Sequence, residues 1–305
     1  MKIAVTGGAG FIGSHLVEKL VCKGDNVVVL DSLWSGKLDN LAKVLPKIDF
    51  KNVDIRENGK MMKSLEDVDA VVHLAALISV QESIVRPLLY QEVNSKGALN
   101  ILNQSMRAGV KRFIFISSAA VYGNPIMMPV NESHTTKPLS PYAVSKLEAE
   151  EHCRSYGKMG RISTAILRLF NVYGPRQTSN QYSGAITQFI ERIKRNQKPV
   201  IFGDGEQSRD FIYVNDVVEY ISKAIVSDTQ ETINIGTGNG TTINQLAKLI
   251  ASIFEKSYIT PLYLPVKEED IRHSKADISK AIRTLGYVPR TSLEEGLKKT
   301  IYFNQ

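Results

Sequence analysis

The sequence predicts an α/β fold, with a doubly wound, parallel sheet of the Rossmann type followed by a smaller C-terminal substrate-binding lobe. Three observations predict it: short β-branched runs alternate with amphipathic helical stretches, a glycine-rich turn joins the first strand to the first helix, and the second strand ends in an aspartate. A chain of 305 residues has room for both parts. We expect residues 1–170 to form the dinucleotide-binding domain and 171–305 the smaller lobe, with segments near 209–240 returning to the first domain.

Bulk composition is that of an ordinary globular protein, with 43% hydrophobic and 23% charged residues. The longest apolar runs have strand length, and the N-terminus has no signal-peptide pattern, so we expect neither membrane insertion nor export. The two cysteines, Cys22 and Cys153, have no metal-ligand spacing and favour a reducing, cytoplasmic location. The five histidines are scattered, so no metal is expected. The net charge of +7 suits an anionic partner, but the basic residues are dispersed, which disfavours nucleic acid.

The first forty residues have the order strand, glycines, helix, strand and acid. The strand is predicted over residues 2–6, the helix from Phe11 to near residue 24, and the second strand over 26–30. Gly7 allows a sharp turn, Gly10 a close approach of backbone to a pyrophosphate, and Gly13 tight packing of the helix on the sheet. Asp31 is predicted to accept hydrogen bonds from the ribose hydroxyls and to repel a 2′-phosphate, which favours NAD over NADP. The alternative role for Asp31 is that of a turn or capping acid.

The alternation continues with strands predicted over 48–51, 70–74 and 112–117 and a long helix over about 88–108. In an open α/β sheet the ligand lies beyond the carboxyl ends of the strands, so Ser118, just after the fifth strand, lies where chemistry would occur. His73, inside a strand, is expected to be a hydrogen-bonded core histidine.

The catalytic candidates lie on the next helix, which Ser140 is predicted to cap and which carries Pro141 in its first turn. Tyr142 and Lys146 are four residues apart and therefore project from one helix face. A free tyrosine has a pKa of about 10; we expect a nearby ammonium and an oxidised nicotinamide to lower that of Tyr142 enough for it to act as a base. Ser118 would hydrogen-bond the reacting hydroxyl and help to pass its proton to Tyr142.

These segments together resemble the extended short-chain dehydrogenase/reductase superfamily, and most closely its nucleotide-sugar 4-epimerases. The resemblance runs nearly end to end, over residues 6–13, 31, 73–76, 117–123, 142–146, 168–175, 203–205, 209–214 and 234–236. It implies NAD as the cofactor and catalysis by Ser118, Tyr142 and Lys146. It also implies that NAD is held by the following residues: Gly7, Gly10, Phe11, Ile12, Gly13, Asp31, Asp54, Ile55, Ala75, Asn94, Tyr142 and Lys146.

Ala119 and Ala120 bear on which reaction of the superfamily to expect. Relatives that dehydrate or decarboxylate the sugar carry acidic residues at these places, and alanine cannot move a proton. We therefore expect a UDP-hexose 4-epimerase that oxidises C4 through NAD to a 4-keto sugar, lets the sugar turn, and returns the hydride to the other face. An NAD-dependent UDP-glucuronate 4-epimerase or another C4-oxidising relative is the alternative, in which Arg86, Arg176 or Arg272 would meet a carboxylate. An inactive NAD-binding regulator is a more distant one.

Several residues are expected to bind the UDP-sugar. Asn171 and Arg209 are placed to bind its phosphates, although Arg209 could instead pair with Asp210 or Asp204. The resemblance places Val200 and Phe202 beside uracil, Lys267 and Asp270 in a segment that departs from the relatives' Arg-x-Gly-Asp, and Ser274 near the sugar C2 substituent. A serine leaves room there for an acetamido group, so UDP-GlcNAc and UDP-GalNAc are expected substrates beside UDP-glucose and UDP-galactose.

The resemblance also implies a homodimer. In the relatives two long helices of each chain, here roughly 88–108 and 141–157, form a four-helix interface. The residues alone indicate amphipathic helices and are equally compatible with a monomer.

Overall fold

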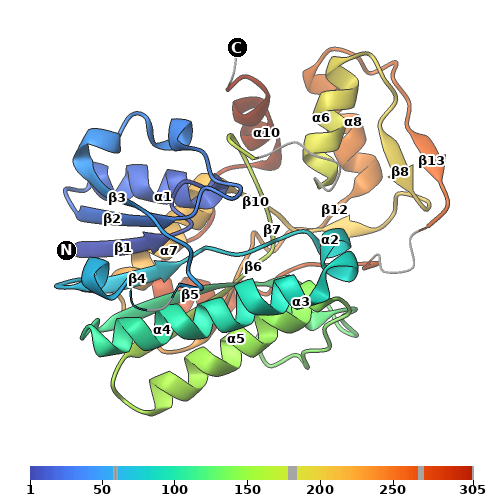
Figure 1. Cartoon of the computed structure of the whole chain (residues 1–305). Helices are drawn as coiled ribbons and strands as arrows, with labels where there is room; N and C mark the ends of the chain where they lie inside the picture. The colour runs from blue at the N-terminus through green and yellow to red at the C-terminus, as the bar shows by residue number, and fades with distance from the viewer. Residues whose placement is uncertain (58, 60, 178–183, 267–270, 304–305) are drawn as a thin grey trace.

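A seven-stranded parallel sheet forms the centre of the protein, in the order β11-β6-β5-β4-β1-β2-β3 (Figure 1). A computed structural model describes residues 1–57, 59, 61–177, 184–266 and 271–303. The predicted α/β fold is confirmed. Strand order reverses between β1 and β4, so the crevice beyond their carboxyl ends is where such folds bind ligands. The strands are β1 (Lys2–Thr6), β2 (Asn26–Asp31), β3 (Ile48–Asn52), β4 (Ala70–His73), β5 (Arg112–Ser118), β6 (Ser163–Leu169) and β11 (Thr232–Ile235).

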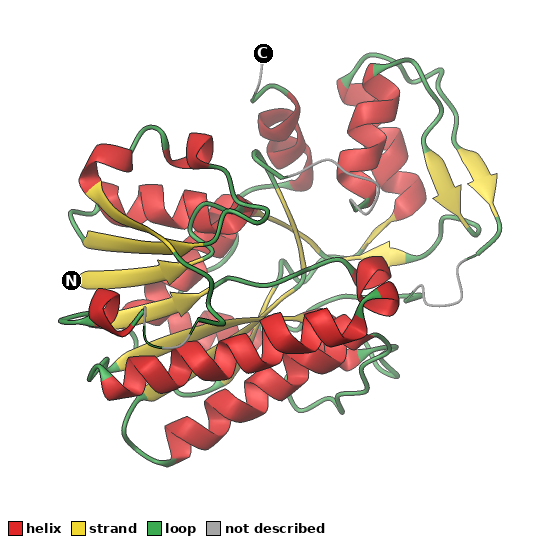
Figure 2. Ribbon diagram, viewed as in Figure 1, coloured by secondary structure: helices red, strands yellow, loops and turns green. Residues whose placement is uncertain are grey.

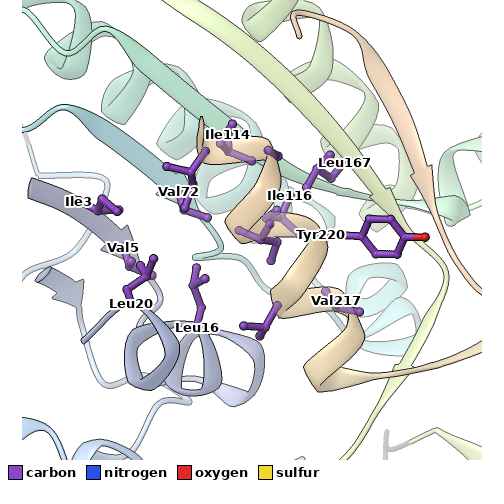
Figure 3. Packing of buried hydrophobic residues seen from close by; sticks show 14 of the residues in the cluster. Ile3, Val5, Leu16, Leu20, Val72, Ile114, Ile116, Leu167, Val217 and Tyr220 are labelled. Carbon is purple, nitrogen blue, oxygen red and sulfur yellow. The ribbon is translucent and has the colours of Figure 1, made fainter. Parts of the chain in front are cut away.

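Helices cover both faces of this sheet. On one face lie α1 (Phe11–Cys22), α7 (Val214–Val226) and α9 (Ser279–Leu285), whose apolar side chains join those of alternate strand residues such as Val5 and Val72 (Figure 3). On the other face α4 (Gly97–Arg107) and α5 (Pro141–Lys158) pack against the intervening residues, among them Ala4 and Val71 (Figure 1). Because both faces are buried, the strands consist of nearly continuous apolar runs, which explains why the sequence revealed them.

The helix predicted over 88–108 is interrupted. It consists of α3 (Pro87–Tyr90), a π-helical turn (Gln91–Lys96) and α4, and is preceded by α2 (Val80–Val85). The wider turn buries Asn94, whose amide hydrogen-bonds the backbone of Leu77 and the hydroxyl of Ser145. Gly97, directly after the turn, packs closely on Ile55, where an added Cβ would lie 2.7 Å from the Ile55 Cδ1 atom.

The C-terminal part adds a second, smaller core (Figure 2). Its strands form three two-stranded sheets: β7 (Asn171–Tyr173) with β10 (Phe211–Tyr213), β8 (Val200–Phe202) with β13 (Leu262–Leu264), and β9 (Ser208–Arg209) with β12 (Thr241–Thr242). The helices α6 (Ala185–Lys194), α8 (Ile243–Ile253) and α10 (Leu293–Ile301) pack around them. Short 3-10 turns occupy Leu38–Leu41, Leu45–Lys47, Met62–Leu65 and Ala119–Tyr122.

Two of the segments expected to return to the large domain behave differently. Residues 232–235 form β11 at the edge of the central sheet, beside β6. Residues 211–213 instead form β10, outside that sheet, and only the helix α7 that follows them packs on it. No helix in the described ranges has the length and apolar character needed to cross a bilayer.

Candidate active site

The turn between β1 and α1 is built around glycines because side chains would not fit there. An added Cβ on Gly13 would lie 2.1 Å from the carbonyl oxygen of Gly7, and one on Gly7 would lie 2.7 Å from the backbone nitrogen of Ala75. Gly7 also adopts a φ of +69°. Gly10 caps α1, so the first N–H groups of this helix face the turn without intrahelical acceptors. The turn therefore presents backbone donors and a positive helix end to an anion.

Asp31 closes the β2 side of this turn. Its carboxylate accepts hydrogen bonds from the backbone of Ala9 at 2.9 Å and of Leu33 at 2.8 Å. Burial raises its pKa, while these two hydrogen bonds lower it. Asp31 therefore has the expected role of a turn acid, and it also lies at the wall of the neighbouring cavity; its role toward a ribose stays a prediction.

A first cavity runs from the glycine-rich turn along the carboxyl ends of the strands. Its walls include nine of the twelve residues expected to hold NAD, namely Gly7, Gly10, Phe11, Ile12, Gly13, Asp31, Asp54, Ile55 and Ala75. Glycines that admit a close ligand, a helix N-terminus and a buried carboxylate suit a dinucleotide. Asn94 does not line this cavity: its amide holds Leu77, which does.

Arg56, Trp34 and Gly36 also line the first cavity, and the sequence analysis did not select them. The guanidinium of Arg56 donates to the Asp54 carboxylate, with Nη2 at 2.6 Å from Oδ2, and lowers its pKa. Arg56 directly follows Asp54 and Ile55, but a lone surface arginine gives no signal in a single sequence.

A second cavity adjoins the first, sharing Phe11, Ile12 and Leu74 with it. Ser118, Tyr142 and Lys146 all line it. The Ser140 hydroxyl caps α5, as predicted, by accepting from the backbone of Ala143 at 3.2 Å. This cap starts the helix at Pro141 and aims Tyr142, one residue later, at the end of β5.

Lys146 is held by the strand it faces. Its Nζ donates to the Ile116 carbonyl at 2.6 Å and lies 4.4 Å from the centre of the Phe115 ring. Burial lowers the pKa of this lysine to about 8, against the opposing effect of Glu150. Tyr142 packs edge to face on Tyr90, with ring centres 6.4 Å apart.

The pKa of Tyr142 departs from the expectation. Burial raises it, and only a hydrogen bond with Ser118 lowers it. The reason is that the phenol is enclosed, so the cost of placing a phenolate there outweighs the favourable contacts within the chain. The expected lowering therefore depends on the positive charge of a bound oxidised nicotinamide.

His73 is a core histidine, as predicted. It is 1% exposed, and its Nδ1 lies 2.7 Å from the Thr6 hydroxyl oxygen, which also accepts from the backbone of Ala75 at 3.2 Å. Burial, and then the charge of Lys146, lower its pKa to about 3. This pair ties the ends of β1 and β4 together beneath the cavity.

Of the residues expected to bind a nucleotide sugar, Asn171, Arg209 and Ser274 line the second cavity. Arg209 donates to the Ser208 carbonyl at 2.8 Å, while Asp204 pairs with Arg272 and Asp210 accepts from Thr237. Val200 and Phe202 line neither of the two cavities; they lie in β8, paired with β13. Lys267 and Asp270 lie outside the described residues.

The walls of the second cavity carry no carboxylate within the described part of the chain. Ala119 and Ala120 occupy the positions directly after Ser118, and Tyr122, Phe211 and Ile271 add further wall. The titratable groups are Tyr142, Lys146, Tyr122, Tyr173 and Arg209. This set can remove and return one proton, but it offers no acid–base pair for eliminating water.

A glycine-cradled dinucleotide groove that opens into a Ser–Tyr–Lys cavity defines an NAD-dependent enzyme of the extended short-chain dehydrogenase/reductase kind. Comparison with known families agrees: residues 3–236 match the NAD dependent epimerase/dehydratase family, and the chain belongs to that family.

Three solved structures illustrate the relationship. A UDP-glucose 4-epimerase from Thermotoga maritima, solved with UDP-glucose, is 41% identical, with a TM-score of 0.94 over 99% of this chain and 98% of its own. A UDP-N-acetylglucosamine 4-epimerase from Methanobrevibacter ruminantium, in complex with UDP-N-acetylmuramic acid, is 39% identical, with a TM-score of 0.94 over 98% and 96%. A UDP-glucuronic acid 4-epimerase from Bacillus cereus, with UDP-glucuronic acid and NAD, is 34% identical, with a TM-score of 0.91 over 99% and 98%.

Proposed function

We propose that this protein is a UDP-hexose 4-epimerase that interconverts UDP-glucose with UDP-galactose and UDP-GlcNAc with UDP-GalNAc. The observation that carries the proposal is the second cavity, where Ser118, Tyr142 and Lys146 converge and the walls carry no carboxylate over the described residues. With Ala119 and Ala120 beside Ser118, oxidation at C4 can be reversed, and the described walls offer no carboxylate to drive elimination.

NAD, held along the first cavity by Gly7, Gly10, Gly13 and Asp31, supplies the hydride acceptor and later donor. Tyr142 takes the proton from the sugar O4, directly or through Ser118, and later returns it. Lys146 supplies positive charge near the phenolate. The Ser118 side chain is held in place because its Oγ accepts a hydrogen bond from the backbone N–H of Ala120 at 3.2 Å. Enclosure of the site keeps water from the 4-keto sugar while it turns.

Asn171 and Arg209 hold the nucleotide end during this rotation. Both line the second cavity, from β7 and β9, and a planar guanidinium suits a pyrophosphate. Anchoring at the diphosphate leaves the sugar free to present either face of C4 to the same acceptor.

A uronate substrate is the alternative. Of the three arginines expected to meet its carboxylate, Arg86 lies 3.5 Å from Glu82, Arg176 pairs with Glu18 at 2.6 Å, and Arg272 pairs with Asp204 at 2.6 Å. None of them lines the second cavity, which favours neutral sugars.

Incubation with UDP-glucose, UDP-GlcNAc and UDP-glucuronate separately, followed by proton NMR of the C4 epimers, tests the proposal. Epimerisation of the first two at the higher kcat/KM is expected. Preference for UDP-glucuronate would replace the proposal with its alternative, and no change in any sugar while NAD stays bound would indicate a regulator.

Ser274 is the residue on which the proposed activity toward acetamido sugars depends. It is 9% exposed and lies at the wall of the second cavity. Ser274→Tyr fills the space for a C2 acetamido group, so kcat/KM for UDP-GlcNAc should fall at least about tenfold more than that for UDP-glucose. Parallel initial rates on both sugars measure this ratio, and an unchanged ratio would contradict the assignment.

We further propose that the protein is a homodimer, paired through α4, α5 and the adjoining α2 and α3. Two apolar side chains in this region lie in water: Val85 is 77% and Leu88 78% exposed. A partner chain would remove them from water.

A further inference from the structure

Glu150 is a fully buried acid that the mechanism above does not use. It is 0% exposed, and its carboxylate accepts four hydrogen bonds. Arg168 donates from Nε at 2.9 Å and from Nη2 at 2.6 Å, the Ser117 hydroxyl at 2.6 Å, and Arg154 at 2.5 Å. A carboxylate this deep is retained only when its charge is compensated.

The same carboxylate lies beside the catalytic lysine. Tyr142, Lys146 and Glu150 follow one another at intervals of four residues and share one face of α5. Lys146 is fastened to the carbonyl of Ile116, and Glu150 to the side chain of the next residue of β5, Ser117. The ammonium and the carboxylate therefore lie one helical turn apart on α5 and bind adjacent residues of β5.

We propose that Glu150 is a positioning residue whose buried carboxylate keeps the Lys146 ammonium charged and directed at the end of β5. The proposal rests on the catalytic role proposed above for Lys146. Glu150 would thus act together with Tyr142 and Lys146, and Arg168 of β6 holds the Glu150 carboxylate in place.

The other titratable groups around Lys146 cannot take this role. His73, from β4, has its pKa lowered to about 3 by burial and is neutral. Cys153, from α5, has its pKa raised by burial and is also neutral. Without the cofactor, burial raises the pKa of Tyr142, so its phenol carries no charge in that state. Among the described residues that act on Lys146, Glu150 is the group that is both acidic and ionised.

Removing the carboxylate charge leaves two buried cations, Lys146 and Arg168, without their shared counter-ion. Arginine stays protonated in proteins, so the lysine responds by losing its proton. At a separation of one helical turn and an effective dielectric constant of about 20, the lost attraction corresponds to about 1–2 pH units in the titration midpoint of Lys146.

The test is a pH titration of Lys146 in the full chain saturated with NAD. NMR of lysine labelled with ¹³C at Cε detects the titration, and the Lys146→Met variant identifies the Lys146 signal. In Glu150→Gln, which keeps the size of the side chain but replaces one acceptor oxygen with an NH2 group, the midpoint should fall by about 1–2 pH units. The alkaline limb of kcat/KM should move down by the same amount. An unchanged midpoint would overturn the proposal.

Two further variants separate charge from structure. Glu151→Gln removes an acid whose side chain is 65% exposed, and it should leave the titration midpoint of Lys146 unchanged. A fall of that midpoint equal to the fall in Glu150→Gln would also overturn the proposal. Arg154→Gln, at a side chain 30% exposed, leaves the core intact and removes a cation that competes for Glu150, so the midpoint should rise. A fall in that variant would contradict the proposal even if Glu150→Gln did not fold.

Because NMR reads the lysine without turnover, the result stands apart from the proposed reaction. If the protein changes no UDP-sugar, the proposed function fails while the titration still decides the role of Glu150.

Discussion

His73 links the buried site to the acid stability of the protein. Its pKa is about 3 in the folded chain and about 6.5 in the unfolded one, so the unfolded state binds the extra proton between these values. The neutral ring therefore contributes its full share to the free energy of unfolding above pH 6.5. This contribution is lost as the pH falls from 6.5 to about 3.

We predict that His73→Asn flattens this dependence. Between pH 7 and 4.5 the parent should lose about 2–3 kcal/mol more of its free energy of unfolding than the variant, because asparagine can still bond the Thr6 hydroxyl but does not titrate. Urea unfolding at both pH values measures the difference. Equal losses in the two proteins would show that His73 is not the group responsible.

Tyr142 is the base in the proposed mechanism. Tyr142→Phe keeps the ring that packs on Tyr90 and removes the hydroxyl alone. We predict a fall in kcat of about 10²–10⁴-fold with NAD affinity nearly unchanged. Initial rates on UDP-glucose and a cofactor titration measure the two quantities; a variant as fast as the parent would refute the role of this residue.

At the scale of single residues, the sequence identified groups whose chemistry depends on local spacing, such as Tyr142 with Lys146. It missed Glu150 and Arg168, because their pairing joins α5 to β6 across the sheet and leaves no local pattern. The lowered pKa expected for Tyr142 concerns the site with oxidised nicotinamide bound and stays a prediction; in the chain alone burial raises this pKa, and burial is a property of the whole fold.

Among the elements, the turn from β1 to α1 has no room for an added side chain at Gly13. Gly13→Ala would place a methyl group 2.1 Å from the carbonyl oxygen of Gly7 and force α1 away from the turn. We predict at least about tenfold weaker NAD binding, with a destabilisation of about 1–3 kcal/mol. Cofactor titration and thermal unfolding measure these effects.

Gly240→Ala is the matched control for this change. A Cβ there would lie 3.6 Å from the Ser208 hydroxyl oxygen, an ordinary contact, so neither NAD affinity nor stability should change. NAD affinity of Gly13→Ala equal to that of the control would contradict the prediction.

The helices show what periodicity can and cannot predict. The span 141–157 agrees with α5 to within a residue because a Ser cap and Pro141 mark its start. The span 88–108 contains a π-helical turn that no periodicity marks, since one wider turn leaves the apolar pattern on both sides almost unchanged. The resemblance, and not periodicity, placed Asn94 at the cofactor, which stays a prediction; in the structure its amide holds the Leu77 backbone.

For the whole molecule, the proposed dimer makes a direct prediction. Leu88→Glu places a charge in the exposed apolar region of α3 and should convert a dimer into a monomer at micromolar concentration, because a buried unpaired carboxylate is costly. Light scattering after size-exclusion chromatography gives the mass. Val226→Glu, at a residue 71% exposed at the end of α7, is the control and should remain dimeric. A parent that is already monomeric would refute the dimer.

Most of the large sheet was predictable because its inner strands are short and apolar, although the edge strand β3 contains Asp49 and Lys51. The smaller lobe was not, because its strands have two or three residues and pair across long intervals, as β8 does with β13. The division of the chain at residue 170 remains a proposal.

β11 has a consequence for biosynthesis. It fills the edge of the central sheet beside β6, although more than sixty residues separate the two in the chain. A nascent polypeptide that has emerged only as far as residue 170 would carry every glycine of the cofactor groove and still expose the flank of its outermost strand. The NAD-binding unit can therefore finish folding only after residue 235 has left the ribosome, and a truncation placed between these points should yield an aggregating product rather than an autonomous domain.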